Sequence, residues 1–373
     1  MSNVVLTASG LYTPPDAISN DELVASYNAY VDRFNEDNAD AIAAGRVAPL
    51  SYSSSEFITK ASGIESRYVV DKPGILDPEI MRPRIRTRSN DEPSIQCEMA
   101  LAAIEPCLAK AGRSAADIDA IIVACSNLPR PYPALAVEVQ HYLGAGGFGF
   151  DLNVACASAA FGIQTAADMI NAGSARRVLM VNPEICSAHL NFRDRDSHFI
   201  FGDVCTAALL EHADEAPAGT GFEVLGTRLS TRFSNNIRNN FGFLNRSEIE
   251  PRSEADRLFV QNGRKVFKEV GPMVADLIVE HAAEYDLEAA DIRRLWLHQA
   301  NINMNTLIAK RVLGRTPAEG EMPAILAEYG NTSSASPMIV FHKFSNDLAV
   351  GETGVLCGFG AGYSAGSVVL RRR

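Results

Sequence analysis

The chain repeats one local pattern at two places separated by nearly half its length, and this repeat limits the folds open to it. Residues 115–127 read AADIDAIIVACSN, and residues 289–301 read AADIRRLWLHQAN. Each segment runs from Ala-Ala-Asp-Ile into an apolar strand, closes in a polar turn on Asn, and precedes an amphipathic helix ending in Leu-Gly. We therefore predict two similar halves packed face to face, residues 1–215 and 216–373. The open alternative is that any α/β chain repeats strand, turn and helix.

Short apolar runs alternate with helical patterns along the whole chain, which is typical of an α/β fold. The predicted strands are IDAIIVAC, FGFDLNVA, RRVLMVNPE, TAALLE, RRLWLHQ and ETGVLCGFG. Two segments, 28–54 and 71–93, have the composition of insertions outside this core. The second carries arginines at 82, 84, 86 and 88, which would share one face of an extended chain. They form either a cradle for a phosphate-bearing ligand or a solvated edge.

Composition excludes several classes of function. The net charge of −11 gives no support for nucleic-acid binding. Seven cysteines stand singly and the histidines form no HxH or HExxH pattern, so neither a disulfide framework nor a metal site is expected. The sequence shows no signal peptide and no apolar run of membrane-spanning length, so we expect a cytoplasmic protein.

Cys156 follows the strand FGFDLNVA and precedes the helix-forming run ASAAFGIQTAADMINAG. At such a junction, free backbone N–H groups and the positive end of the helix dipole favour thiolate over thiol. We therefore expect a reactive thiolate that accepts an acyl group. The alternative is a buried, inert cysteine, which is the usual state of a free thiol.

Three later segments supply complementary groups. His298 ends the strand RRLWLHQ, Asn331 lies in the turn EYGNTSSASPM, and Gly360–Ala361 form a glycine-rich turn between two strands. Backbone N–H groups of Cys156 and Ala361 can hold the oxyanion formed when a thioester acylates the cysteine. His298 and Asn331 can then donate to the carbonyl oxygen of a malonyl thioester, which favours loss of CO₂ and attack of the carbanion on the acyl group.

These motifs resemble the thiolase superfamily, and within it the β-ketoacyl-acyl-carrier-protein synthase III enzymes. VACASAAFG, HQAN, GNTSSAS and GFGAGYSAGS match four motifs in the family's order, and the resemblance spans nearly the whole chain. It implies a duplicated α-β-α-β-α fold, a homodimer, and a catalytic triad of Cys156, His298 and Asn331. It also implies condensation of an acyl-CoA primer with malonyl-acyl carrier protein in fatty acid biosynthesis, with no cofactor or metal.

The resemblance assigns further residues to binding. For acyl-CoA they are Phe57 at the adenine, Arg195, Phe267 at the pantetheine tunnel, Tyr132 reaching the partner subunit's acyl pocket, Asn301 and Gly360. For docking of acyl carrier protein they are Arg264, Lys265, Lys268, Lys310 and Arg311. Each of these residues has an ordinary surface or core role as its alternative.

The chain departs from the family's pattern in ways that bear on substrate. Asn303 replaces a basic residue used in carrier-protein docking, Ala61 replaces a common arginine, and Ala361 replaces a glycine of the oxyanion turn. The two insertions flank the ligand entrance of the family, so we expect a primer longer than acetyl-CoA, of medium length. The alternatives are another acyl transfer of the superfamily, such as head-to-head condensation or transfer to a secondary metabolite, and a catalytically silent acyl-binding partner.

Overall fold

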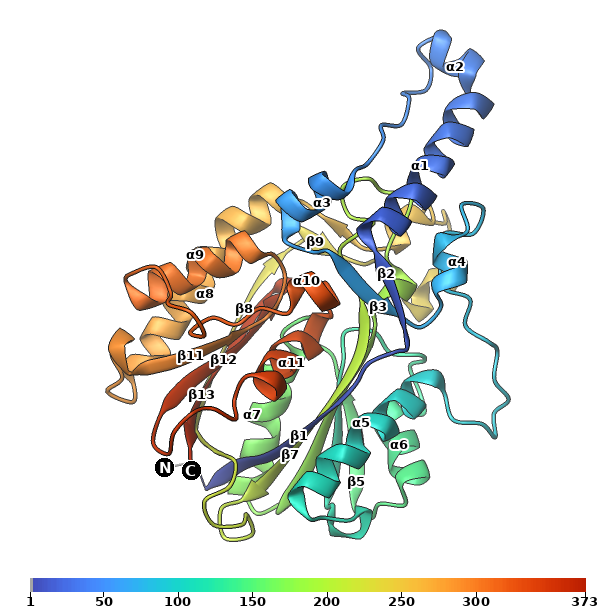
Figure 1. Cartoon of the computed structure of the whole chain (residues 1–373). Coiled ribbons are helices and arrows are strands. Elements are labelled where there is room, and N and C mark those ends of the chain that lie inside the picture. Colours follow the sequence, from blue (N-terminus) through green and yellow to red (C-terminus); the bar gives the residue numbers. More distant parts are fainter. Residues whose placement is uncertain (1–2) are drawn as a thin grey trace.

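The computed structural model describes residues 3–373, and at its centre is a mixed sheet of nine strands in the order β11-β12-β13-β8-β1-β7-β6-β4-β5 (Figure 1). From one edge, the strands are β11 (Ile292–Leu297), β12 (Thr353–Gly360), β13 (Gly362–Arg372), β8 (Phe222–Ser234), β1 (Val4–Tyr12), β7 (Asp203–His212), β6 (Arg177–Ile185), β4 (Ala120–Ala124) and β5 (Phe148–Leu152). All six strands predicted from the apolar runs are present.

The sheet has the same pairing pattern on either side of its middle. β4 is parallel to β6, and β7 and β1 follow antiparallel; β11 is parallel to β12, and β13 and β8 follow antiparallel. The two Ala-Ala-Asp repeats form matching 3-10 turns, Ala115–Asp117 and Ala289–Asp291, before β4 and β11. The predicted boundary between residues 215 and 216 lies in the connection from β7 to β8. As a division between domains it stays a prediction.

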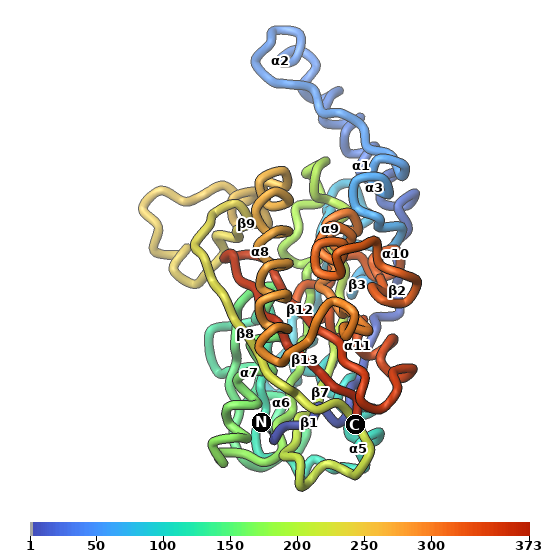
Figure 2. Tube along the Cα trace, turned by 90° about the vertical axis from the view of Figure 1, so that its left-hand side faces the viewer, coloured from blue at the N-terminus to red at the C-terminus, as the bar shows by residue number. Residues whose placement is uncertain are grey.

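Among the described residues, the two halves of the sheet join only where β1 and β8 pair at two positions, so the strands of each half form a layer of their own and the helices bring the number of layers to five. α7 (Ser158–Asn171) contacts strands of both halves, and α11 (Ser336–Lys343) packs on β1, β11 and β12. Outside them, α5 (Ile95–Ala111) and α6 (Leu135–Leu143) cover the first half, and α8 (Gly263–Ala283) and α9 (Ile302–Leu313) cover the second (Figures 1 and 2). Alternate residues of β4 serve the two faces: Ile122 joins the central core, and Ile121 packs toward α5. The α-β-α-β-α class inferred from the sequence is confirmed.

The first insertion forms an arm that projects from the body (Figures 1 and 2). α1 (Asn20–Asp37) is started by a capping box between Ser19 and Glu22, and α2 (Ala39–Ala43) forms the tip. At the base of the arm are the antiparallel pair of β2 (Asp16–Ser19) and β3 (Ser66–Val69), α3 (Ser55–Ser62), and α4 (Lys72–Leu76) of the second insertion. The chain is completed by α10 (Leu326–Tyr329) and by the short pair β9 (Ile237–Arg238) and β10 (Val260–Gln261).

The four arginines of the second insertion all face carboxylates. The pairs are Arg82–Glu254 at 3.9 Å, Arg84–Asp71 at 3.3 Å, Arg86–Glu92 at 2.8 Å, and Arg88–Glu98. Their charges are neutralised along a solvated edge, so the structure favours that alternative over a phosphate cradle.

Within residues 3–373, no helix is long and apolar enough to cross a membrane. The expected cytoplasmic location stays a prediction.

Trp296 anchors the central layer. It is fully buried, packs edge-on against Phe222 and Phe341 with ring centroids 5.8 and 5.1 Å away, and donates its indole N–H to the Phe344 carbonyl at 3.0 Å. Since Trp296 lies on β11, Phe341 on α11 and Phe222 on β8, this cluster fastens the second half together.

We expect Trp296→Ala to lower the free energy of unfolding by about 3–5 kcal/mol, because it opens a cavity and leaves a carbonyl unpaired. Urea denaturation followed by circular dichroism measures the loss. Phe233→Ala, which truncates an aromatic side chain that is 87% exposed, is the matched control. A loss of the same small size in both variants would contradict this account of the core.

Candidate active site

Cys156 lies at the predicted junction, in the turn between β5 and the first residue of α7. Ala155, immediately before it, has a φ of 47°, a left-handed conformation that is unfavourable for a residue with a side chain. The Ser158 hydroxyl secures the turn, since it accepts the Val154 N–H at 2.8 Å and donates to the Ala155 carbonyl at 2.7 Å. This local arrangement holds a half-buried thiol between strand and helix.

Ser333 links the three residues of the predicted triad. Its hydroxyl donates to the Cys156 sulfur at 3.4 Å, and its backbone N–H donates to Asn331 Oδ1 at 2.9 Å. Its carbonyl accepts the Ser336 hydroxyl at 2.8 Å, and that hydroxyl lies 2.6 Å from His298 Nδ1. The structure therefore brings together Cys156 of the first half with His298 and Asn331 of the second. Their catalytic roles stay predictions.

The glycine-rich turn approaches the same sulfur. A β-carbon added at Gly360 would stand 2.8 Å from the Cys156 β-carbon and 3.1 Å from the sulfur, so only glycine fits there without a shift. The backbone N–H groups of Ala361 and of Cys156 itself act on the sulfur and lower the pKa of the thiol. Both N–H groups that were predicted to hold an oxyanion thus act on the Cys156 sulfur, and their part in binding an oxyanion stays a prediction.

The expectation that the junction favours thiolate is wrong for this site. Burial raises the pKa of the Cys156 thiol to about 11 and outweighs the Ser333 hydroxyl and the two N–H groups, which lower it. Burial also lowers the pKa of His298 to about 3. At neutral pH the site therefore holds a thiol beside a neutral imidazole.

Ser336 controls which nitrogen of His298 carries the proton. A serine hydroxyl has one proton, and here it is donated to the Ser333 carbonyl while the oxygen accepts the Gln299 N–H at 3.1 Å. In this arrangement Nδ1 carries the imidazole proton, and Nε2 is an acceptor. Nε2 becomes a donor, as the predicted decarboxylation requires, when Ser336 turns its proton toward Nδ1.

The predicted coenzyme A residues form a second cluster. The Arg195 guanidinium lies 4.2 Å from the centre of the Phe57 ring, and its Nε donates to the Tyr52 carbonyl at 2.7 Å. Asn301 uses its side chain structurally, because Nδ2 donates to the Ala61 carbonyl at 2.7 Å and Oδ1 accepts N–H groups at the start of α9. Its predicted part in binding substrate is untested.

The remaining predicted residues lie on the surface. Tyr132 is 82% exposed, and Phe267 is exposed on α8 beside Lys268. α8 and α9 pack side by side (Figure 2), and the predicted docking cations belong to these two helices. These cations are Arg264, Lys265, Lys268, Lys310 and Arg311. Arg311 is paired with Asp276 at 2.8 Å; the other four have no ion-pair partner in the part of the chain that the structure describes.

Two residues next to the triad escaped the sequence analysis. Ser333 lies within the quoted motif GNTSSAS, but nothing in the motif marks it as the residue that joins the triad. Glu184, a fully buried carboxylate at the end of β6, acts on Cys156 and raises the pKa of its thiol. Its signal was a lone charge at the end of the apolar strand RRVLMVNPE.

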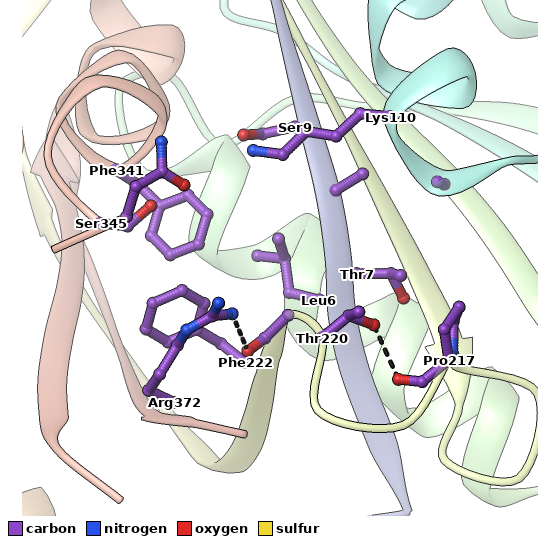
Figure 3. A pocket seen from close by; sticks show the side chains of 14 residues that line it. Leu6, Thr7, Ser9, Lys110, Pro217, Thr220, Phe222, Phe341, Ser345 and Arg372 are labelled. Atoms are coloured by element: carbon purple, nitrogen blue, oxygen red, sulfur yellow. Dashed lines mark hydrogen bonds between the residues drawn. The ribbon is translucent and has the colours of Figure 1, made fainter. Parts of the chain in front are cut away.

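Two hollows lie away from the triad. A cavity of about 190 Å³ lies between β1 and the ends of α5 and α11, and its wall includes Lys110, Phe222 and Arg372 (Figure 3). An open hollow of about 480 Å³ borders the start of α8 and includes Arg264. Neither contains a residue of the triad.

Sequence comparisons identify relatives along nearly the whole chain. Residues 150–232 match the family model described as 3-oxoacyl-[acyl-carrier-protein] synthase III, and residues 282–372 match its C-terminal model. A β-ketodecanoyl-[acyl-carrier-protein] synthase of Pseudomonas aeruginosa is 59% identical over 347 residues, which is 93% of this chain and 99% of the relative. A β-ketoacyl-[acyl-carrier-protein] synthase III of Granulibacter bethesdensis is 30% identical over the full length of both.

Solved structures with the same fold include two condensing enzymes. The 3-oxoacyl-(acyl carrier protein) synthase III of Pseudomonas aeruginosa superposes with a TM-score of 0.75 at 24% identity, covering 99% of this chain and 98% of the other. The priming β-ketosynthase of the R1128 polyketide pathway gives 0.77 at 24% identity, covering 99% and 96%. At this identity these structures establish the fold.

We expect alkylation of Cys156 by iodoacetamide to accelerate by about tenfold per pH unit between pH 7 and 10, because the thiolate fraction keeps rising below a pKa of about 11. Peptide mass spectrometry separates Cys156 from the other six cysteines. A peptide of sequence LNVACASAA, with an ordinary thiol, is the control and should level off near pH 9. A plateau near pH 8 in the folded protein would contradict the effect of burial.

Proposed function

The chain belongs to the 3-oxoacyl-[acyl-carrier-protein] synthase III family, and from that membership we propose that it condenses a medium-chain acyl-CoA with malonyl-acyl carrier protein. The products are a 3-oxoacyl-acyl carrier protein, CoA and CO₂, so the protein is an acyltransferase of fatty acid biosynthesis. The observation that carries the proposal is the meeting of Cys156, His298 and Asn331 around Ser333.

The name of the Pseudomonas relative supports the medium chain length. A ten-carbon 3-oxoacyl product arises from an eight-carbon primer and the two carbons that malonate keeps after losing CO₂. Because this relative is 59% identical over 93% of the chain, we propose octanoyl-CoA as the preferred primer.

In the first half-reaction, the Cys156 sulfur attacks the acyl-CoA carbonyl. The N–H groups of Cys156 and Ala361 stabilise the oxyanion, the carbon–sulfur bond to CoA breaks, and CoA leaves as its thiol. Because Cys156 starts as a thiol, its proton must move during this step. Neutral His298, with Nε2 unprotonated, is a suitable acceptor, and it then passes this proton to the sulfur of the departing CoA.

In the second half-reaction, His298 and Asn331 donate to the thioester oxygen of malonyl-acyl carrier protein. Loss of CO₂ leaves a carbanion that attacks the acyl carbon, so that a carbon–carbon bond forms and the bond to Cys156 breaks. The sulfur leaves as a thiolate and takes up one proton from solvent to become a thiol again. Side chains and backbone N–H groups supply all of this chemistry, so the proposal includes no cofactor and no metal.

The proposed assembly is a cytoplasmic homodimer. β5 is the edge strand of the first half, so one row of its backbone groups is free to pair. Tyr132, 82% exposed in the single chain, is the aromatic side chain that would enter the partner's acyl pocket. An acyl carrier protein with a negatively charged surface would dock on the cations of α8 and α9.

Incubation with acyl-CoAs of two to twelve carbons should give an adduct on Cys156 that is strongest at eight carbons. Intact-protein mass spectrometry reads the adducts, and Cys156→Ser, which lacks a nucleophilic sulfur, should show none. A clear preference for acetyl-CoA would overturn the medium-chain assignment, and adducts in Cys156→Ser would overturn the nucleophile.

His298→Ala and Asn331→Ala should each slow release of ¹⁴CO₂ from labelled malonyl-acyl carrier protein by about 100-fold, since each removes a donor to the developing enolate. Loss of Asn331 should affect self-acylation far less. Asn346→Ala removes an exposed amide and serves as the control. Equal loss of both half-reactions in Asn331→Ala would contradict this division of roles.

A further inference from the structure

Glu184 is a fully buried carboxylate that the condensation chemistry does not use. Six donors satisfy it: the Ser126 N–H at 2.9 Å, the Ser126 hydroxyl at 2.6 Å, Asn127 Nδ2 at 2.9 Å, the Ser334 N–H at 3.2 Å, the Ser334 hydroxyl and the Cys186 thiol at 3.6 Å. Within residues 3–373 it has no basic partner closer than 4 Å, so hydrogen bonds alone compensate its burial. Burial of a carboxylate costs desolvation free energy, which suggests that Glu184 has a specific function.

The donors come from both halves of the sheet. Glu184 Oε2 accepts from the Ser126 and Asn127 side chains, which follow β4, and from the Cys186 thiol at 3.6 Å. Oε1 accepts the Ser126 N–H together with both donors of Ser334, a residue of the Asn331 turn in the second half. The carboxylate is therefore a bridge between the first-half strands and the turn that carries Asn331.

The residue beside this bridge is strained. Ser333 has a φ of 49°, which a serine adopts only when its surroundings fix it. On one side of Ser333, Glu184 holds Ser334; on the other side, Asn331 Oδ1 accepts the N–H of Ser333. In this conformation the Ser333 hydroxyl reaches the Cys156 sulfur.

We propose that Glu184 is a positioning residue that clamps the Asn331 turn to β4 and β6 and thereby keeps the Ser333 hydroxyl on the Cys156 sulfur. The catalytic value of that contact rests on the proposed function, whereas the contact itself is measurable on the thiol alone.

Glu184 acts on Cys156 in two opposite ways. Its charge raises the pKa of the thiol, while the Ser333 contact that it maintains lowers the same pKa. The other titratable groups beside the sulfur are Cys186, which follows β6, and His298, which is neutral. Removing the carboxylate therefore changes the thiol through charge and through position, and the two parts can be separated.

A double-mutant cycle between Glu184→Gln and Ser333→Ala separates them. An amide accepts through one oxygen only, so the Glu184→Gln variant releases either Ser334 or the Ser126–Asn127 side, and either release opens the bridge between the two halves. In the Ser333→Ala background, Glu184→Gln removes only the charge and should speed iodoacetamide alkylation of Cys156. In the protein that keeps Ser333, Glu184→Gln also loses the Ser333 contact, and this loss should offset the gain. The factor by which Glu184→Gln changes the alkylation rate should therefore differ about threefold or more between the two backgrounds.

Ser334→Ala is the second arm, and it leaves the carboxylate in place. It should shift the pH profile of Cys156 alkylation toward higher pH, and the shift should vanish in the Ser333→Ala background. Glu211→Gln is the matched control, because Glu211 is also fully buried, but it lies toward the far end of β7, where it pairs with Arg113 at 2.8 Å. It should lower stability and leave the alkylation profile unchanged.

Equal rate ratios in both backgrounds, or no shift in Ser334→Ala, would overturn the proposal. Circular dichroism verifies that each variant is folded, and if Glu184→Gln does not fold, the Ser334→Ala arm decides alone. Alkylation requires neither acyl-CoA nor carrier protein, so it tests the positioning role of Glu184 even if the proposed condensation fails. Likewise, failure of the positioning role would not contradict the condensation.

Discussion

The close packing of α7 against both halves of the sheet is the constraint on which the site depends. α7 presents small residues at its contacts, and two of these contacts tolerate nothing larger. A β-carbon at Gly162 would stand 2.6 Å from the Met180 sulfur on β6, and one at Gly366 on β13 would stand 2.6 Å from the Ala160 β-carbon. Close approach here brings the start of α7, and so Cys156, within reach of turns from the second half.

The sulfur is held by donors and penalised by burial at once. Two backbone N–H groups and a hydroxyl lower the pKa of the Cys156 thiol, but burial and the Glu184 charge raise it by more. The resting group is therefore a thiol. Such a balance is compatible with the nucleophilic role proposed for Cys156. In the proposed reaction, the same N–H groups would bind more strongly once negative charge develops on an acyl oxygen in a site closed to water.

Elements and junctions were predictable because their signals are local. The apolar runs predicted the strands, and the glycine-rich run predicted the turn beside Cys156. What escaped prediction depends on contacts between distant residues: Ser333 and Cys156 are 177 positions apart, and Ser334 and Glu184 are 150 apart. The state of the thiol was mispredicted for the same reason, since a helix terminus is visible in the sequence and burial by another half is not.

The internal repeat explains why a carboxylate stands beside the nucleophile. In the matching ladders, Ile122 pairs with Met180 and Trp296 pairs with Leu356, which makes Glu184 on β6 the counterpart of Gly360 on β12.

The helix turns correspond in the same way. Ala155 and Ser333, with φ values of 47° and 49°, each stand three residues before the first residue of a central helix, so Ser334 is the counterpart of Cys156. The thiol of Cys156 in the first half thus faces a glycine of the second half that leaves it room. Ser334 of the second half is held by a carboxylate of the first half. Under the two proposals, the copies of one turn have diverged, one toward chemistry and one toward fixing the geometry of its partner.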